Sequence, residues 1–260
     1  MSYNYKDDLP AVAVPVPFAP SAPSAPERKN ASYPSFNRAG EVNPHQTSDL
    51  KKQGFTQGLI DVISSSTNYF PLRIWVVDNS GSMNKSDGQR LVTASNKNFK
   101  IKLVPCTRWA ELQETIEYHV QMAALIHAPT TFRLLNNPGA HIGPQEFTVG
   151  EDLSTLDKDV DVARRTMQRA SPSGVTPLTS HLVQIRDYVA AITDDLNAEG
   201  KKVTIILATD GLPTNESGIG GDYETNLFTN ALRSLEGLPV WIVIRLCTDE
   251  EDVVEVSLSS

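Results

Sequence analysis

The chain has 260 residues, of which 40% are hydrophobic, and this is enough for one domain, or two small ones, with an apolar core. The formal net charge of −8 argues against nucleic acid or an anionic membrane as the main partner. No stretch approaches the ~18 apolar residues of a membrane span, the N-terminus lacks the basic and apolar regions of a signal peptide, and the two cysteines give no disulfide framework. We therefore expect a cytoplasmic protein without a membrane span.

Proline dominates the first part of the chain. Residues 1–48 contain eight of the 17 prolines, some of them in tandem Ser-Ala-Pro units that favour extended polyproline II. We predict a disordered Pro/Ala/Ser-rich tail over residues 1–50. Pro23, Pro26 and Arg28 also fit the proline–x–x–proline pattern that domains of the SH3 or WW type bind, although a solvated tail is the simpler interpretation.

The sequence changes character after this tail. Phe55, Leu59, Val62 and Ile63 have the spacing of an amphipathic helix. The run at 72–77 is almost wholly apolar, which is typical of a strand that is buried on both faces. The folded part is therefore predicted to begin at about residue 54.

A hairpin and a long helix are predicted next. Strands at 89–94 and 99–104 flank Ser-Asn-Lys-Asn and form the hairpin near 88–105. A helix at 108–127 follows, with Thr107 as its N-cap. The apolar face of this helix steps by three and four residues: Trp109, Leu112, Ile116, Val120 and Ala123.

Helices and strands alternate through the rest of the chain. Strands are predicted at 130–136, 146–149, 202–208 and 238–247, and helices at 155–169, 178–198 and 223–235. Long apolar strands separated by amphipathic helices indicate a parallel sheet that is covered on both faces. We predict a doubly wound, Rossmann-like α/β domain over 54–256, with its functional groups at the carboxyl ends of the strands.

Oxygen-bearing side chains follow two of the apolar strands. Asp78, Ser80 and Ser82 come directly after the first strand, and Asp210 comes after the strand Lys-Val-Thr-Ile-Ile-Leu-Ala. Thr176 lies in a loop just before a helix. If the two strands are neighbours, the three loops converge on the rim of the sheet. Two carboxylates and three hydroxyls form an all-oxygen set, which suits Mg²⁺, Mn²⁺ or Ca²⁺ and not Zn²⁺.

These motifs resemble those of a von Willebrand factor type A domain with a metal-ion-dependent adhesion site. The family's Asp-x-Ser-x-Ser motif is matched by residues 78–82, its threonine before a helix by Thr176, and its aspartate after a strand by Asp210. The resemblance covers roughly residues 70–247 and keeps the family's order. The hairpin near 88–105 is an insertion relative to the family. The chain ends where the family has a last strand and helix, so a C-terminally truncated domain is expected.

The resemblance implies a non-catalytic, metal-dependent protein-binding module. Ser80, Ser82 and Thr176 are then direct ligands of Mg²⁺, with Mn²⁺ or Ca²⁺ as alternatives, while Asp78 and Asp210 act largely through water. A partner protein supplies an Asp or Glu carboxylate to the open position of the ion. The site is expected on the rim of the sheet and not in the core.

Two other functions stay open at this stage. An enzyme could use Asp78 for phosphotransfer or Ser80 for hydrolysis. However, Ser80 stands where dehalogenase-type phosphatases have a second acid, and a Gly-x-Ser-x-Gly elbow does not surround it. A scaffold could instead act through its proline-rich tail.

Overall fold

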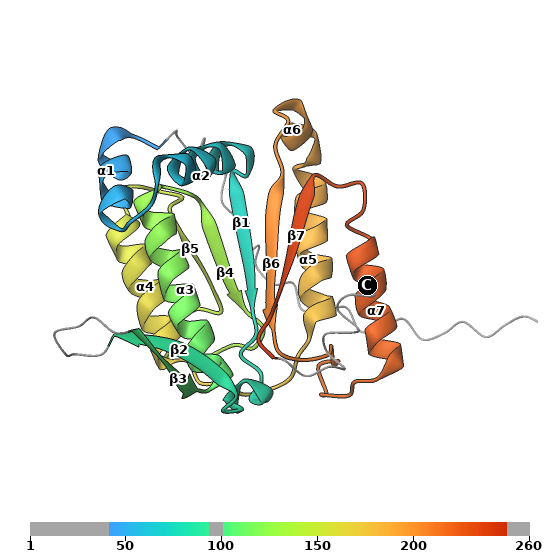
Figure 1. The fold of residues 1–260 in the computed structure, drawn as a ribbon. Coiled ribbons are helices and arrows are strands. Elements are labelled where there is room, and N and C mark those ends of the chain that lie inside the picture. The colour runs from blue at the N-terminus through green and yellow to red at the C-terminus, as the bar shows by residue number, and fades with distance from the viewer. Residues whose placement is uncertain (1–41, 94–100, 249–260) are drawn as a thin grey trace, which may run out of the picture. The chain divides into compact units, whose positions relative to one another are not determined.

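A five-stranded sheet forms the centre of the domain (Figure 1). The computed structural model describes residues 42–93 and 101–248. The strand order is β5-β4-β1-β6-β7. The strands are β1 (Leu72–Val77), β4 (Thr130–Leu134), β5 (Glu146–Val149), β6 (Val203–Thr209) and β7 (Val240–Leu246). The prediction of disorder at 1–41 lies outside the described residues.

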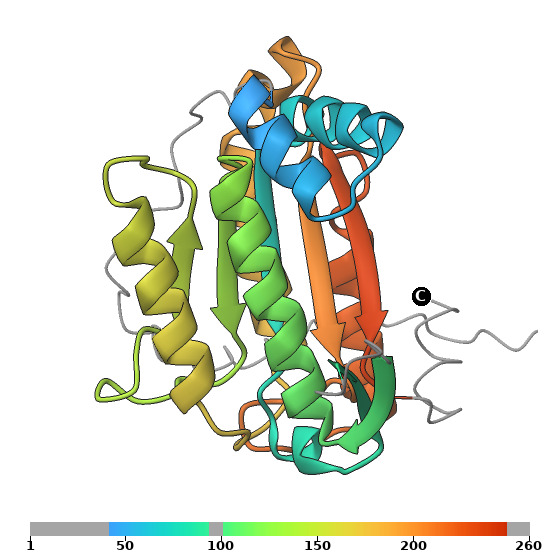
Figure 2. The same ribbon diagram turned by 60° about the vertical axis from the view of Figure 1, so that its left-hand side comes forward.

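The sheet is parallel except at one edge. β1 pairs in parallel with β4 on one side and with β6 on the other, and β7 continues in parallel beyond β6. β5 pairs antiparallel with β4, and Figure 2 shows its arrow running against the others. The predicted α/β fold with a mostly parallel sheet is therefore confirmed. Because β1 and β6 are neighbours, their carboxyl ends also meet, as the predicted site requires.

Four long helices cover the two faces of the sheet: α3 (Arg108–Leu125) and α4 (Leu156–Arg169) on one, and α5 (Leu178–Ala191) and α7 (Asp222–Arg233) on the other. Successive side chains of β1 alternate between these layers, because strand side chains have a period of two. Trp75 and Val77 belong to the core under α3 and α4, whereas Ile74 and Val76 belong to the core under α5 and α7. No helix in the described part of the chain is long and apolar enough to cross a membrane.

The predicted hairpin is confirmed at the carboxyl end of the sheet. β2 (Gly88–Thr93) pairs antiparallel with β3 (Ile101–Cys106), and Leu91 lies opposite Leu103. The short helix η1 (Gly81–Asn84) connects β1 toward this hairpin. Figure 1 places η1 and the hairpin below the ends of the β1 and β6 arrows.

Part of the predicted tail is helical instead. Residues 44–50 belong to α1 (Pro44–Lys52), which the Asn43 side chain caps by accepting hydrogen bonds from backbone N–H groups of the first turn. Leu50 is fully buried and packs in a small core with Ile60. The assignment of these residues to the tail was wrong because the high proline content concealed an Asn-Pro helix start.

The next helix exists as predicted, but only part of its predicted apolar face is covered: Phe55 and Ile63 pack against the small core of Leu50 and Ile60. α2 (Gln57–Tyr69) buries Ile60 and Thr67. Leu59 and Val62, which were assigned to its apolar face, are 47% and 63% exposed. The Thr67 hydroxyl donates to a backbone carbonyl within the helix, and this bond allows a polar residue to be buried there.

The helix predicted at 178–198 is interrupted. It consists of α5 and a separate short helix, α6 (Thr193–Ala198). The Thr193 hydroxyl donates to the Val189 carbonyl at 2.8 Å, a back-bond that is known to bend helices. The apolar spacing continues across the break, so that Leu196 remains fully buried and the sequence pattern did not reveal the interruption.

Candidate functional site

The loops that follow β1 and β6 begin side by side. Val77, the last residue of β1, lies beside Ala208 of β6. One residue further on, the Asp78 N–H donates to the Ala208 carbonyl at 2.9 Å. Asp210 is the first residue after β6. The two predicted acids therefore occupy adjacent positions at the same edge of the sheet.

Asp78 is fully buried and accepts hydrogen bonds from neutral donors. Its Oδ1 accepts from the backbone N–H of Ser80 at 2.8 Å, and its Oδ2 accepts from the Thr209 hydroxyl at 2.5 Å. Burial raises the pKa of the Asp78 carboxyl, and this outweighs the opposing effect of the hydrogen bonds from Ser80 and Thr209. Both oxygens of Asp78 are engaged inside the protein.

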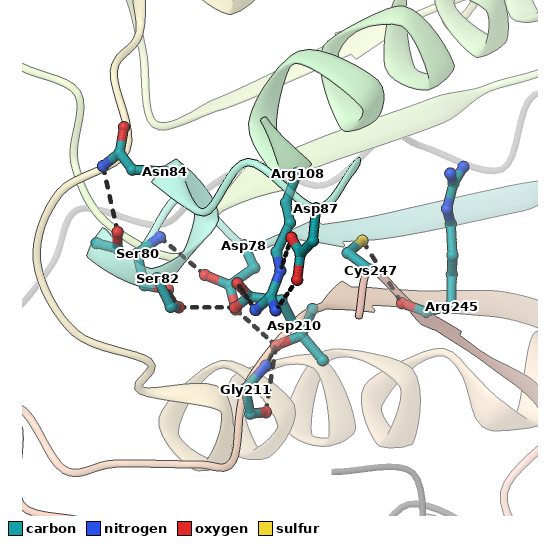
Figure 3. Close-up of polar contacts among 12 residues, drawn as sticks. Asp78, Ser80, Ser82, Asn84, Asp87, Arg108, Asp210, Gly211, Arg245 and Cys247 are labelled. Carbon is teal, nitrogen blue, oxygen red and sulfur yellow. Dashed lines mark hydrogen bonds and ion pairs between the residues drawn. The ribbon is translucent and has the colours of Figure 1, made fainter. Parts of the chain in front are cut away.

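The two serine hydroxyls connect this loop to the second acid. Ser80 lies in extended backbone just before η1, and Ser82 lies within η1, so the turn brings both hydroxyls together. Ser80 Oγ and Ser82 Oγ are 3.0 Å apart. Ser82 Oγ donates to Asp210 Oδ1 at 2.7 Å, as Figure 3 shows.

The third loop brings Thr176 to the same place. The Thr176 N–H donates to the Thr214 hydroxyl at 2.9 Å, and the Thr214 N–H donates to the Thr176 carbonyl at 2.9 Å. These bonds fix the loop before α5 against the loop after β6. A Cβ atom added to Gly211 would lie 3.8 Å from Thr176 Oγ1 and 4.0 Å from Ser82 Oγ. The two hydroxyls therefore flank one small space beside Gly211.

Two asparagines that the sequence analysis did not identify hold the loops together. The Asn79 side chain accepts from the Asn136 N–H at 2.8 Å and donates to the Asn136 carbonyl at 2.9 Å. The Asn136 side chain donates to the Val175 carbonyl at 2.8 Å. Gly174 has a φ of +88°, and a Cβ there would lie 2.5 Å from Asn136 Oδ1, so a glycine is required. β4 ends at Leu134, two residues before Asn136, whereas the sequence pattern placed Asn136 inside the predicted strand.

A buried arginine also reaches the site, and the sequence analysis missed it. Arg108, which is 1% exposed, donates from Nη1 to Asp210 Oδ2 at 2.9 Å. Its Nε and Nη2 donate to the two oxygens of Asp87, at 2.7 and 2.5 Å (Figure 3). The guanidinium group holds the pKa of Asp87 below its usual value. Arg108 is the first residue of α3, where a cation opposes the helix dipole, and this conflict was the sequence signal for an acidic partner.

The site is more enclosed than the sequence predicted. Asp78, Ser80, Thr176 and Asp210 are 0%, 2%, 6% and 2% exposed, and Ser82 is half-buried. The five residues lie at the edge of the sheet and outside the apolar core clusters, as expected, but four of them are buried. The loops cover one another, because the Gly81 N–H donates to the Gly174 carbonyl at 3.2 Å across the site.

The donor set fits a hard divalent cation. Neighbouring ligand oxygens around Mg²⁺, at ~2.1 Å from the ion, are about 3.0 Å apart, and Ser80 Oγ and Ser82 Oγ are separated by 3.0 Å. Residues 42–93 and 101–248 contain no group of three or more His, Cys, Asp and Glu side chains arranged to hold a metal. An ion at this site would therefore depend on hydroxyl oxygens, with the two carboxylates supporting them.

Comparison with known proteins gives no independent assignment. No protein-family model matches the sequence, and no curated protein matches it. The functional argument therefore depends on the geometry of the site itself.

Proposed function

We propose that this chain is a von Willebrand factor type A-like module that binds a partner protein through a divalent metal ion, most favourably Mg²⁺. The observation that carries the proposal is the convergence of three loops at the adjacent ends of β1 and β6. The converging residues are the five that the family motifs identified: Asp78, Ser80, Ser82, Thr176 and Asp210. Their side chains offer only oxygen ligands, which suit Mg²⁺.

The hydrogen bonds assign a role to each group in the proposed site. Ser82 donates its only hydroxyl proton to Asp210 Oδ1 and therefore accepts from Ser80 Oγ, which leaves one lone pair of the Ser82 oxygen for a cation. Ser80 is oriented by the bond from its backbone N–H to Asp78, and its hydroxyl meets that of Ser82. Thr176 faces the same space from the opposite loop.

The same arrangement leaves a place for a partner carboxylate. Hydroxyl and water ligands are neutral, so the ion keeps most of its charge and attracts an anionic oxygen. Mg²⁺ exchanges one water for one carboxylate oxygen without a change in coordination number. We therefore propose that the partner presents an Asp or Glu side chain to this edge of the sheet.

The contacts do not favour an enzyme that uses Asp78 or Ser80. Asp78 is fully buried and both of its oxygens accept hydrogen bonds, so neither is free to attack phosphorus. In the described ranges, the Ser80 hydroxyl meets Ser82 and not a histidine that could remove its proton. Hydrolysis of a generic phosphate ester is therefore expected to be absent, and measurable turnover that Asp78→Asn abolishes would support the enzyme instead.

Affinity capture with the immobilised chain tests the proposal. We expect proteins that are retained in Mg²⁺, released by EDTA and not retained by Asp78→Ala. Asp152→Ala is the matched control, because Asp152 is an exposed acid whose oxygen accepts from Ser154 away from the site. Replacing acidic residues of a captured protein by their amides should remove its binding. Retention that survives EDTA would contradict the proposal.

The same capture experiment distinguishes binding by the domain from binding by the proline-rich segment, which is the scaffold alternative. A chain that begins at residue 42 keeps the Asn43 cap of α1 and lacks the proline-rich segment. We expect this chain to retain the metal-dependent partners. If the deletion removes all binding while EDTA has no effect, the tail and not the domain carries the interaction.

A further inference from the structure

We propose that Arg108 is a built-in counterion of Asp210 that competes with the divalent cation and thereby lowers the metal affinity of the site. This inference rests on the proposed function, because it concerns the same site. It adds a regulating residue that belongs to none of the motifs by which the site was identified. The structure suggests it because a permanently charged side chain lies where a metal-binding acid needs to face a metal.

The pairing of Arg108 with Asp210 is buried and direct. Their side chains are 1% and 0% exposed, and Arg108 Nη1 lies 2.9 Å from Asp210 Oδ2. The other oxygen of Asp210 accepts from Ser82. Each oxygen of this carboxylate therefore already has a donor in the described structure. An arginine stays protonated at any physiological pH, so its charge is a fixed feature of the site.

The second partner of Arg108 lies closer to solvent. The Asp87 side chain is 51% exposed and binds the guanidinium group through both oxygens. Asp87 directly precedes β2, so Arg108 connects the start of the hairpin to the loop that follows β6. Arg108 already contacts both a buried acid and a half-exposed acid. A small movement of its guanidinium group therefore changes how strongly it pairs with each of them.

The formal charges show why Arg108 opposes a metal. Asp78 and Asp210 together carry two negative charges, which a divalent cation would neutralise. Among the fully buried groups, Asp78, Asp210 and Arg108 sum to −1, so a divalent cation would bring them to +1, and the half-exposed, solvent-screened Asp87 offsets this charge only in part. Like charges repel strongly in a poorly solvated site. The arginine therefore stabilises the metal-free protein and weakens metal binding at the same time.

Titration calorimetry of Mg²⁺ into Arg108→Gln tests this competition. We expect the variant to bind Mg²⁺ at least tenfold more tightly than the parent. Arg245→Gln is the matched control, because Arg245 is also an arginine near α3 but pairs with Glu111 at 3.1 Å and not with the site acids. Its Mg²⁺ affinity should stay within about twofold of the parent. A variant Arg108→Gln that binds Mg²⁺ no more tightly than Arg245→Gln would overturn the proposal.

Thermal unfolding of the same proteins gives a readout that does not depend on a partner. In EDTA, Arg108→Gln should unfold at a lower temperature than the parent, because Asp210 loses its counterion. Saturating Mg²⁺ should raise the unfolding temperature of Arg108→Gln by more than it raises that of the parent. An arginine with a purely structural role would leave the Mg²⁺-dependent increase unchanged in the variant, and that result would overturn the proposal.

A second variant keeps the test valid if Arg108→Gln does not fold. Asp87→Asn removes a half-exposed acid and should strengthen the pairing of Arg108 with Asp210. We expect Mg²⁺ affinity at least threefold weaker than in Glu114→Gln, a control that removes an equal charge from an acid paired with Arg90. Equal affinities in these two variants would overturn the proposal.

The outcomes also separate this inference from the proposed function. If the parent binds Mg²⁺ and the Arg108 and Asp87 variants behave like their controls, the inference fails and the metal site stands. If Mg²⁺ binds Arg108→Gln but not the parent, the inference is supported. If neither protein binds Mg²⁺, both the inference and the proposed function fail.

Discussion

Two buried carboxylates lie at the same edge of the sheet, and the protein stabilises them in different ways. Asp78, after β1, accepts hydrogen bonds from the Ser80 backbone and the Thr209 hydroxyl, which are both neutral donors. Asp210, after β6, accepts one hydrogen bond from the Ser82 hydroxyl and a charge-assisted one from Arg108. The β1 loop therefore stabilises its anion with dipoles, whereas the β6 loop uses a cation.

This difference gives the two acids different roles toward an added cation. An anion surrounded by dipoles keeps its attraction for an added cation, whereas an anion paired with arginine is already compensated. In the proposed metal site, Asp78 thus supplies most of the uncompensated negative charge. Asp210 additionally compensates the buried Arg108, whose other acidic partner shown here, Asp87, is half-exposed.

The largest expected effect is that of Asp210→Ala on folding. The substitution removes the buried acid that pairs with Arg108, and the loss of one member of a buried ion pair costs about 3–5 kcal/mol. Urea unfolding in EDTA measures this cost. The double variant Asp210→Ala/Arg108→Met should recover at least half of the loss, because it also removes the buried guanidinium group that Asp210 compensated. If Asp78→Ala destabilises the protein more than Asp210→Ala, the distinction between the two acids is wrong.

Asp78→Asn is expected to cost less, about 1–3 kcal/mol in the metal-free protein. The amide keeps the shape of the side chain but turns an NH₂ group toward one of the two donors, Ser80 N–H or Thr209 Oγ1. No buried cation is left unpaired. Thr209→Val is the matched variant, since it removes one of these hydrogen bonds and should cost about 1 kcal/mol. If Asp78→Asn costs as much stability as Asp210→Ala, then pairing with a buried cation does not distinguish Asp210 from Asp78.

The pH dependence of stability should differ in sign between Asp78 and Asp87. Arg108 lowers the pKa of Asp87, so its stabilising contribution is present above the unfolded value of ~3.9 and is lost as the pH falls through the lower folded pKa. Burial raises the pKa of Asp78, so its contribution is fully present below ~3.9 and is lost as the pH rises through the raised folded pKa.

Urea unfolding of the metal-free proteins across the acid range checks these signs. The difference between the parent and Asp87→Asn should shrink toward low pH. The stability of the parent relative to Asp78→Asn should instead increase as the pH falls. If the stability difference between the parent and each variant changes with pH in the same direction for both, then Asp87 is not stabilised by a cation and Asp78 by neutral donors in the way described.

The smallest expected effect on folding is that of Gly211→Ala. The added methyl group makes ordinary contacts near Thr176 Oγ1 and Ser82 Oγ, at 3.8 and 4.0 Å, so stability should change by less than about 0.5 kcal/mol. The methyl group occupies the space between the two hydroxyls, and Mg²⁺ affinity should fall severalfold. Gly58→Ala is the control, because its added Cβ meets nothing within 4 Å. Equal Mg²⁺ affinity in both variants would show that the space beside Gly211 is not part of the site.

The sequence predicted those elements in which one local pattern dominates. The apolar run of β1 and the three-and-four spacing of α3 both appear where they were expected, and Thr107 caps α3 by accepting from the Ala110 N–H. The sequence patterns gave wrong predictions where two local signals overlapped. The proline content concealed α1, and the continuing apolar spacing through Leu196 concealed the break caused by Thr193.

The convergence of the three loops could be predicted from the sequence, but the charged contacts around them could not. Motif spacing identified Asp78 and Asp210, and the parallel pairing of β1 with β6 brings them together. The pairing of Arg108 with Asp210 joins residues 102 positions apart, and periodicity carries no information about such a contact. The support from Asn136 was missed for the same reason, because it acts across 57 residues on Asn79.

Calorimetric titration of Mg²⁺ into the metal-free parent and into Asp78→Ala tests the central claim most directly. The account predicts one Mg²⁺ bound per chain in the parent and a loss of binding in Asp78→Ala, with Asp152→Ala binding as the parent does. If Asp78→Ala binds Mg²⁺ as well as the parent, the three loops do not form a metal site, and the account is contradicted.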